Sequence, residues 1–188
     1  KNRNDSCDRL GKCLRYSHSG KSLKFMLIGV VSDTHNNLKN IELIIDLFND
    51  LNVELVIHTG DICNEGSLKK FSKLNCELFG VFGNNDRNES GLHDVIDQNS
   101  FRFEEPPFLF KYGNRSIAVF HEPDSIENYI DKNKEIDIIL HGHTHRYREE
   151  IVNGTLIFNP GESAGMQKGN NAIGRIDLNS LKTERIFF

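Results

Sequence analysis

The stretch LHGHTHRY, residues 140–147, holds three histidines, His141, His143 and His145, directly after an apolar run. Imidazole is a common ligand for transition-metal ions. Residues two apart in an extended chain face the same side, so His143 and His145 can offer two nitrogen atoms to one point in space. The spacing therefore suggests a metal site where a predicted strand ends.

Other donors also stand just after predicted strands. In chain order they are Asp33 with His35, Asp61, Asn84 and His121, which follow the apolar runs 26–32, 53–58, 76–83 and 116–120. A single strand-end histidine is usually a hydrogen-bonded structural residue. Donors at five strand ends together favour a shared metal site, with the ligands Asp33, His35, Asp61, Asn84, His121, His143 and His145.

The types of donor atom limit which metal ions the site can bind. Carboxylate, imidazole and amide oxygen without a thiolate suit Mn²⁺, Fe²⁺, Ni²⁺ or Zn²⁺ in a catalytic site better than a structural zinc. Seven donors are too many for one tetrahedral ion. Two ions that share Asp61 as a bridging carboxylate account for all of them: Asp33, His35, Asp61 and His145 on the first, and Asp61, Asn84, His121 and His143 on the second.

Such a pair of ions, about 3.5 to 4 Å apart, would acidify a bridging water and hold the non-bridging oxygens of a phosphate. The predicted chemistry is the hydrolysis of a phosphate ester by a hydroxide nucleophile. We take Asp61, Asn84 and His143 as the catalytic positions of this site.

The elements that position these donors alternate in the first half of the chain. Short apolar runs predict buried strands at 26–32, 53–58 and 76–83. The segment 36–51 has apolar residues at three- and four-residue spacing and predicts an amphipathic helix, and 66–74 predicts a shorter one. This alternation indicates parallel βαβ units, whose functional residues lie beyond the carboxyl ends of the strands.

The second half has a different pattern. Strands around Gly113-Asn114 and Asn153-Gly154 predict two hairpins, with a helix at 126–132 and a strand at 136–140 between them. The runs NAIGRIDL and TERIFF supply the last two strands, whereas the middle segment 87–107 shows only a helical hint. The hairpins favour a second, more antiparallel sheet.

The composition is that of a soluble globular protein. The chain has 188 residues, 37% of them hydrophobic and 27% charged, and no apolar run reaches the roughly 20 residues of a membrane span. We expect one compact domain at 26–188, a cytoplasmic location and no membrane partner. The four cysteines show no metal-site spacing, and we expect no structural disulfides.

Residues 1–25 differ from the rest. They hold seven Lys/Arg and two Asp, which gives a net charge of +5. Because the whole chain has a net charge of −4, residues 26–188 carry −9. We expect this polar stretch to be a poorly ordered leader or an added extension; a nucleic-acid or membrane tether is the alternative. The acidic remainder argues against tight binding of duplex nucleic acid, because that binding depends on Lys and Arg.

The ordered motifs D-x-H, G-D, G-N, H and G-H-x-H resemble those of the calcineurin-like metallophosphoesterases, in particular their small single-domain bacterial and archaeal phosphodiesterases. The segment Asn159-Pro160-Gly161-Glu162 is similar to the N-P-G segment of that branch. The resemblance runs from Met26 to the end. It implies a four-layer α/β/β/α sandwich of two mixed β-sheets flanked by helices, two divalent metal ions, often Mn²⁺, and a small phosphate-ester substrate.

Two positions depart from the family pattern. Asn85 replaces a histidine that is thought to protonate the leaving group, and an amide cannot act as a general acid. Asp86 then becomes a residue that caps the loop or supports the ligands. Glu122 stands where the branch usually has a glycine between two histidines, which changes the rim of the pocket.

Several alternatives stay open. The chain can be a phosphodiesterase, a phosphomonoesterase, a pyrophosphatase or a nuclease, or a protein-interaction scaffold of the same fold, as in the retromer subunit. The sequence is compatible with several natural substrates and metals and with a homo-oligomer. Of the other histidines, we expect His58 and His141 to be structural, and His93 is the candidate for a substitute acid.

Overall fold

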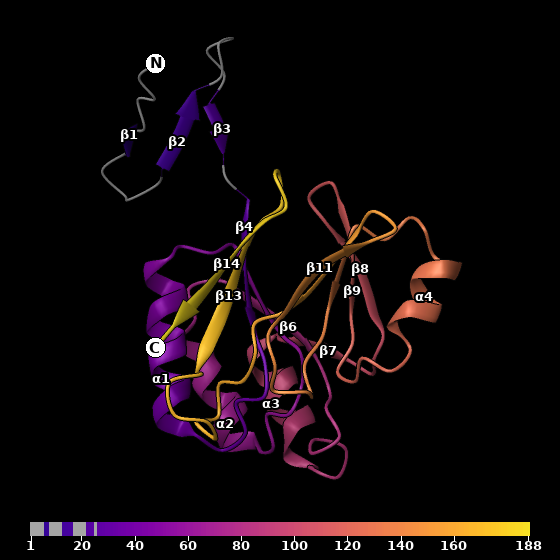
Figure 1. Cartoon of the computed structure of the whole chain (residues 1–188). Helices are drawn as coiled ribbons and strands as arrows, with labels where there is room; N and C mark the ends of the chain where they lie inside the picture. The colour runs from indigo at the N-terminus through magenta and orange to yellow at the C-terminus, as the bar shows by residue number, and fades with distance from the viewer. Residues whose placement is uncertain (1–5, 8–12, 17–21, 25) are drawn as a thin grey trace.

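Two β-sheets lie face to face and carry helices on their outer faces (Figure 1). The computed structural model describes residues 6–7, 13–16, 22–24 and 26–188. In Figure 1 the helices of the first half of the chain cover one outer face, and α4 (Ile126–Lys132) lies at the opposite side. This arrangement confirms the predicted four-layer α/β/β/α sandwich of two mixed sheets.

The first sheet is parallel at its centre. Its strands, from edge to edge, are β14 (Lys182–Phe187), β13 (Ala172–Asp177), β4 (Leu27–Val31), β5 (Leu55–His58), β6 (Glu77–Val81) and β7 (Arg102–Glu104). Strands β4 to β7 run parallel to one another. The last two strands of the chain pair antiparallel and extend this sheet past β4.

The second sheet combines two parallel pairings with a hairpin at each edge. Its strands are β11 (Arg148–Val152), β12 (Thr155–Asn159), β10 (Ile138–Leu140), β9 (Arg115–Val119) and β8 (Phe108–Tyr112). Strand β10 is parallel to both β12 and β9. The hairpins β8–β9 and β11–β12 turn where the sequence predicted them.

In the described residues, four α-helices and one short 3₁₀ helix complete the layers. They are α1 (Leu38–Asp50), α2 (Glu65–Lys70), η1 (Phe71–Lys73), α3 (Gly91–Asn99) and α4 (Ile126–Lys132). Helix α1 begins at Asn37, whose side chain accepts a hydrogen bond from the Asn40 N–H at 3.1 Å. None of the helices in the described part of the chain has the length and apolar character needed to cross a bilayer.

The central strands bury both of their faces, as continuous apolar runs predict. In β4 and β5, alternate residues such as Val30 and Ile57 point between the sheets, whereas Val31 and Val56 point to the helices. The second sheet shows the same division, with Ile139 and its neighbours facing α4. The parallel strands are therefore packed on both faces, and their carboxyl ends lie together at one edge of the sheet.

The structure adds elements that the sequence did not predict. Strand β7 has three residues at the edge of the first sheet, in the segment that lacked a clear pattern. Residues 1–25 contain three short strands, β1 (Ser6–Cys7), β2 (Cys13–Tyr16) and β3 (Ser22–Lys24), which pair antiparallel. The other residues of that stretch lie outside the described part, so its identity as a leader or extension stays a prediction, as does the cytoplasmic location.

Gly29 in β4 tests how tightly α1 packs on the first sheet. A methyl group at this position would overlap the ring of Phe48, a residue of α1 that is 1% exposed. We expect Gly29→Ala to lower the free energy of unfolding by about 1–3 kcal/mol, because the added methyl group forces this buried ring to shift. Urea unfolding of the metal-free protein measures the change.

The matched control is the double variant with Phe48→Leu, in which the smaller side chain makes room for the methyl group. Gly29→Ala should cost clearly less in that background than in the parent. Equal costs in both backgrounds would show that the ring does not limit this position.

Candidate metal centre

The loops that follow the parallel strands are tied to one another by backbone hydrogen bonds. After β4, the Asp33 N–H donates to Gly60 O at 3.2 Å and the His35 N–H donates to Asp61 O at 2.9 Å. The two sheets are joined at the same edge, because the His143 N–H donates to the Asp33 carboxylate at 3.1 and 3.2 Å. Donors far apart in sequence therefore meet there.

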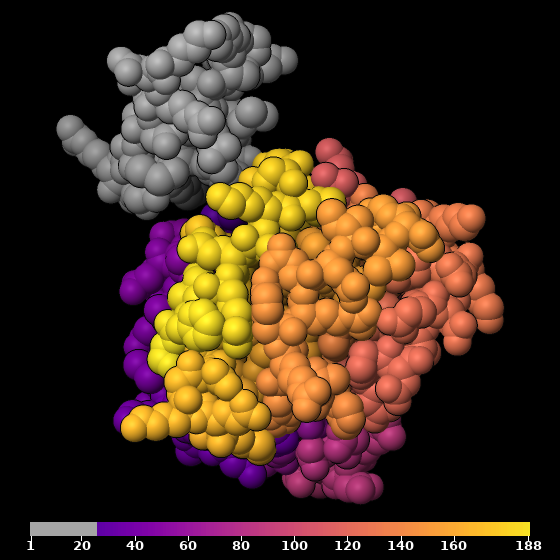
Figure 2. Space-filling view, viewed as in Figure 1, coloured from indigo at the N-terminus to yellow at the C-terminus, as the bar shows by residue number. Residues whose placement is uncertain are grey.

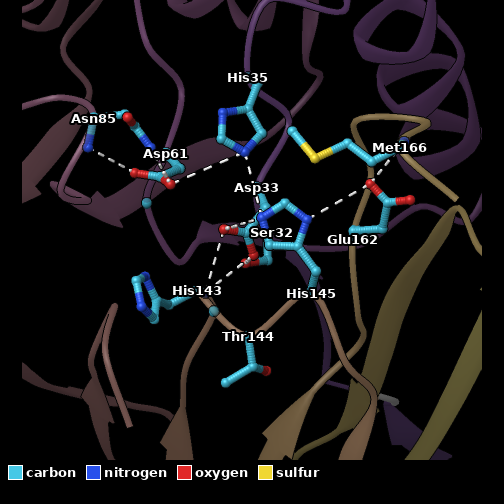
Figure 3. A network of polar contacts seen from close by, with 12 residues as sticks. Ser32, Asp33, His35, Asp61, Asn85, His143, Thr144, His145, Glu162 and Met166 are labelled. Atoms are coloured by element: carbon cyan, nitrogen blue, oxygen red, sulfur yellow. Dashed lines mark hydrogen bonds and ion pairs between the residues drawn. The ribbon is translucent and has the colours of Figure 1, made fainter. Parts of the chain in front are cut away.

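A first group of donors gathers around the Asp33 carboxylate (Figure 3). His145 Nε2 lies 3.5 Å from Asp33 Oδ1 and 3.4 Å from His35 Nε2. His35 Nε2 in turn lies 4.0 Å from Asp61 Oδ2. The ligand atoms of Asp33, His35 and His145 are all within 4.8 Å of one another, a spacing that one cation can span.

A second group gathers around the Asn84 side chain. Its Oδ1 atom lies 3.0 Å from His121 Nε2 and 3.0 Å from His143 Nδ1. His121 Nε2 is also 3.5 Å from Asp61 Oδ1. The structure thus brings all seven predicted donors together, in the two groups that the sequence suggested, with Asp61 between them. Metal binding by these residues stays a prediction.

The donor set fits divalent cations on physical grounds. Asp33 is fully buried, and burial is the main cause that raises the pKa of its carboxyl group above the ordinary value. Nearby histidines and the hydroxyl of Ser32, which donates to this carboxylate, act in the opposite direction. A bound cation beside Asp33 would supply the positive charge that keeps the carboxylate ionised. The residues present therefore fit the divalent ions Mn²⁺, Fe²⁺, Ni²⁺ and Zn²⁺ that the sequence analysis suggested.

The donors of the centre differ in their exposure to solvent. Asp33, Asp61 and His121 are buried, whereas Asn84 and His143 are exposed. In the first group the side chains of His35 and His145 are partly exposed, at 18% and 21%, so each group has a donor that solvent can reach.

Three of the histidines have a second polar neighbour at the ring nitrogen that faces away from the centre. His121 Nδ1 donates to Thr59 O at 2.8 Å, and His35 Nδ1 lies 3.1 Å from Cys63 Sγ. Such outer contacts fix the tautomer and the ring orientation of a metal ligand.

His145 Nδ1 is the third of these nitrogens and lies 3.8 Å from the carboxylate of Glu162. Sequence reasoning noted Glu162 only as part of the N-P-G segment and gave it no role. A carboxylate directly after that segment was the signal available to find it.

A buried carboxylate holds the loop of Asp61. Asp86, 2% exposed, accepts hydrogen bonds from the backbone N–H groups of Asp61, Ile62, Cys63 and Gly83 at 2.7 to 2.9 Å. The predicted role of Asp86 as a residue that caps this loop matches these contacts. Because one side chain satisfies four N–H groups, the loops after β5 and β6 keep a single arrangement.

Five of the seven donors have left-handed backbone conformations. They are His35 (φ 44°), Asp33 (φ 52°), His145 (φ 56°), Asp61 (φ 61°) and His143 (φ 66°). Non-glycine residues in this region cost of order 1–3 kcal/mol each, so the surrounding contacts must hold them there. Left-handed residues of this kind cluster at functional sites in proteins.

Gly142 allows the two sheets to approach. A methyl group there would overlap the Ser32 hydroxyl and lie 2.8 Å from Thr59 Oγ1 and 3.1 Å from Asp33 Oδ2. The sequence suggested that glycines beside the donors allow sharp turns. Gly60 does have a positive φ of 100°, whereas Gly142 is needed for the close approach.

Asn85 interacts directly with the shared carboxylate. Its side-chain Nδ2 donates to Asp61 Oδ2 at 2.7 Å, and its backbone N–H donates to Asp61 Oδ1 at 2.9 Å (Figure 3). The position that holds a histidine elsewhere in the family pattern is thus used here to orient Asp61.

The other histidines have structural surroundings. His58 is fully buried, with Nε2 3.0 Å from Thr34 Oγ1 and Nδ1 accepting from the Gly60 N–H, and burial lowers its pKa to about 3. His141 is 1% exposed, and burial lowers its pKa to about 4. Both fit the structural role expected of them. His93 is exposed on α3 against Phe82, so nothing in its contacts supports the role of a substitute acid.

Cys63 does not have the properties of a nucleophile. Burial, followed by the nearby charge of Asp86, raises the pKa of its thiol to about 12. Reactive cysteines need a lowered pKa, so this free thiol stays protonated and serves as a contact of His35.

Glu122, the residue after the ligand candidate His121, forms an ion pair. Arg87 Nη2 lies 3.8 Å from Glu122 Oε1, and both side chains are about half exposed, at 53% and 42%. A pair of this kind adds little stability. The carboxylate partner, Glu122, stands where the resemblance leads us to expect a glycine.

Comparisons with known proteins agree with this geometry. The sequence model of the calcineurin-like phosphoesterase superfamily domain matches residues 26–180. A phosphodiesterase of Methanocaldococcus jannaschii is 35% identical over 171 residues, which cover 86% of this chain and 98% of that protein. A probable metallophosphoesterase of the same organism is 28% identical over 138 residues, or 72% of this chain and 67% of that protein.

Solved structures show the same fold. An archaeal phosphodiesterase superposes with a TM-score of 0.80 at 33% identity, covering 87% of this chain and all of that one. Vps29 of Entamoeba histolytica, solved in complex with zinc, gives a TM-score of 0.61 at 20% identity and covers 86% of this chain and 99% of that one. At that identity the second likeness concerns the fold alone.

Asp86 provides a direct test of the loop. We expect Asp86→Ala to lower the free energy of unfolding of the metal-free protein by about 2–4 kcal/mol, because it leaves buried N–H groups without an acceptor. Chemical denaturation in the presence of a chelator measures this. Asp46→Ala, at an exposed position of α1, is the control and should change stability by less than about 0.5 kcal/mol. Equal effects of the two variants would contradict the role of Asp86.

His58 provides a test by pH. Its folded pKa of about 3 lies below the ordinary value of 6.5, so below pH 6.5 the unfolded chain binds a proton that the folded protein excludes. Stability should therefore fall as the pH is lowered from about 6.5 towards 3, by up to about 1.4 kcal/mol per pH unit for this group. His58→Gln should show a smaller slope between pH 6.5 and 5 in urea unfolding. Identical slopes in parent and variant would rule out His58 as a source.

Proposed function

The chain belongs to the calcineurin-like phosphoesterase superfamily, and from this membership we propose that it is a phosphodiesterase that uses two divalent metal ions. The observation that carries the proposal is the place of Asp61. Its Oδ2 atom lies 4.0 Å from His35 Nε2 in the first donor group, and its Oδ1 atom lies 3.5 Å from His121 Nε2 in the second. One carboxylate can thus serve both ions.

Each ion would be held by donors of one group. Asp33, His35, Asp61 and His145 hold the first, and Asp61, Asn84, His121 and His143 hold the second. Oxygen and imidazole ligands suit Mn²⁺, which we propose as the native metal, with Ni²⁺, Fe²⁺ and Zn²⁺ as substitutes. When bound, the two ions supply the acidification of the attacking water and the neutralisation of phosphate charge.

The residues of the chain itself supply orientation. Asn85 holds both oxygens of Asp61, and the His143 N–H holds the Asp33 carboxylate. Both contacts keep the donors at fixed positions while a phosphate binds. Fixed positions lower the cost of reorganisation during the reaction.

The side-chain amide of Asn85 donates a hydrogen bond but cannot transfer a proton to a leaving group. Among the described residues near the shared carboxylate, this amide takes the place at which the family pattern has a histidine, and it donates to Asp61. The leaving oxygen must therefore depart without help from that position, which favours substrates with acidic leaving groups. General acid catalysis is typically worth about 10²- to 10⁴-fold, so esters with poor leaving groups should be slow.

The proposed substrate is a small phosphate diester. The 35% identical relative from M. jannaschii is called a phosphodiesterase, which supports a diester over a monoester. The net charge of −9 for residues 26–188 argues against duplex nucleic acid as the substrate. A scaffold without catalysis is the competing function, and the complete donor set favours the enzyme.

The experiment uses metal-free protein reconstituted with Mn²⁺. We expect hydrolysis of bis-nitrophenyl phosphate to depend on added Mn²⁺ and to exceed hydrolysis of nitrophenyl phosphate in kcat/KM. Asp61→Ala should lose at least about 10³-fold in kcat/KM and bind fewer than two ions per chain, because both groups share this residue. Absorbance of nitrophenolate and metal analysis of the equilibrated protein give the two readouts.

His93→Asn is the matched control, because it changes an exposed histidine of α3 outside the donor groups. Its activity should equal that of the parent. Preferred hydrolysis of the monoester would replace the proposal by a phosphomonoesterase, and no Mn²⁺-dependent turnover of either ester would favour the scaffold. An Asp61→Ala protein that still binds two ions would contradict the bridging role.

A further inference from the structure

Glu162 is a buried carboxylate directly after the N-P-G segment. It is 0% exposed. Its Oε1 atom accepts from the Gln167 N–H at 2.7 Å, and its Oε2 atom accepts from the Met166 N–H at 3.1 Å. Oε2 also lies 3.8 Å from His145 Nδ1. Figure 3 shows Glu162 between Met166 on one side and His145 on the other.

The charge of Glu162 has few partners. Within the described part of the chain, no Lys or Arg side chain is paired with it, and the titratable group beside it is His145. Burying a carboxylate without compensation is costly, and two neutral N–H groups compensate only part of its charge. The remaining compensation must come from the direction of the imidazole.

The other ring nitrogen of His145 faces the first donor group. Nε2 lies 3.5 Å from Asp33 Oδ1 and 3.4 Å from His35 Nε2. A histidine that turns one nitrogen to a cation and the other to a carboxylate is oriented by that carboxylate, which also makes the imidazole a stronger donor. Glu162 occupies the outer position of such an arrangement.

We propose that Glu162 is a positioning residue for His145, which strengthens binding of the first ion and couples that ion to the loop 163–171. The inference rests on the proposed function, because it assumes that the two donor groups bind cations. It goes beyond that function by giving the first ion, and not the second, a link to a segment outside the donor set.

The loop has its own attachments, which allow its role to be separated from that of Glu162. Asn37 Nδ2 donates to Ala164 O at 2.7 Å, and Asn40 Nδ2 donates to Ser163 O at 2.8 Å, both from the start of α1. Met166 at the loop is 63% exposed. The contacts of Glu162 with the Met166 and Gln167 N–H groups are therefore an addition to a loop that α1 already anchors.

Coupling of this kind is reciprocal. If the first ion orders His145 and Glu162, then Glu162 holds the Met166 and Gln167 N–H groups more firmly when the ion is present. Amide hydrogen exchange reports this directly, since a stronger acceptor contact slows exchange of those two N–H groups. This readout does not depend on catalysis.

The test compares Mn²⁺ binding to the parent and to Glu162→Gln, which keeps the size of the side chain and removes its charge. We expect one of the two ions to bind about 10- to 100-fold more weakly and the other to change less than about twofold. In an Asn84→Ala background, which leaves the first group intact, Glu162→Gln should weaken the remaining ion. In a His35→Ala background, which leaves the second group, it should not.

Asn40→Ala is the matched control, because it removes an attachment of the same loop without touching His145 or Glu162. It should leave both Mn²⁺ affinities within about twofold. A loss in Asn40→Ala equal to that in Glu162→Gln would show that Glu162 acts only by holding the loop, and would overturn the proposal.

A second measurement needs no variant. In the parent protein, Mn²⁺ should slow exchange of the Met166 and Gln167 amides, measured by hydrogen exchange and mass spectrometry of the loop peptide. Unchanged exchange, or unchanged affinities in Glu162→Gln, would overturn the inference while two bound ions in the parent leave the proposed function intact. A parent that binds no pair of ions would instead refute the proposed function itself.

Discussion

The contact between the Asp86 carboxylate and four backbone N–H groups is the interaction on which the centre depends. It joins the loop after β5 to the loop after β6, and so fixes Asp61 and the turn that leads to Asn84. Charge-assisted hydrogen bonds are about twice as strong as neutral ones, and here they are shielded from water. The hydrogen bond from the Asp61 N–H to this carboxylate offsets part of the free-energy cost of the left-handed conformation of Asp61.

The two sheets contribute differently to the same edge. The first sheet supplies the carboxylates Asp33 and Asp61, which lie at the buried floor, whereas the second supplies three of the four histidines. Arg185 of β14 also joins the sheets, since its Nε donates to Pro160 O at 2.8 Å. On the face shown in Figure 2, the C-terminal strands (yellow) lie beside the segment that ends the second sheet (orange).

Periodicity and strand-end donors were enough to predict the βαβ units, the second sheet and the set of donors that meet, whereas the four layers were implied by the resemblance to a known family. Apolar runs such as that of β4 identify buried strands because both of their faces are covered. A polar residue after one such run is usually structural, but donors after five of them indicate a shared site. The sequence did not show β7, whose three residues are mostly exposed and carry no alternation. Nor did it show the contacts of Glu162 and Asn85, because these depend on how loops meet across two sheets.

The distance in sequence between the paired donors has a mechanical consequence. The His143 N–H and the Asp33 carboxylate are 110 residues apart, and each donor group draws on both sheets. A cation shared across that gap would act as a cross-link that closes a loop of more than a hundred residues, as a disulfide does in secreted proteins. The entropy that such a closure removes from the unfolded chain grows with the length of the loop. Cys63 and Cys76 are free thiols, so between the two halves of the chain the metal, and not a disulfide of those residues, would supply the cross-link.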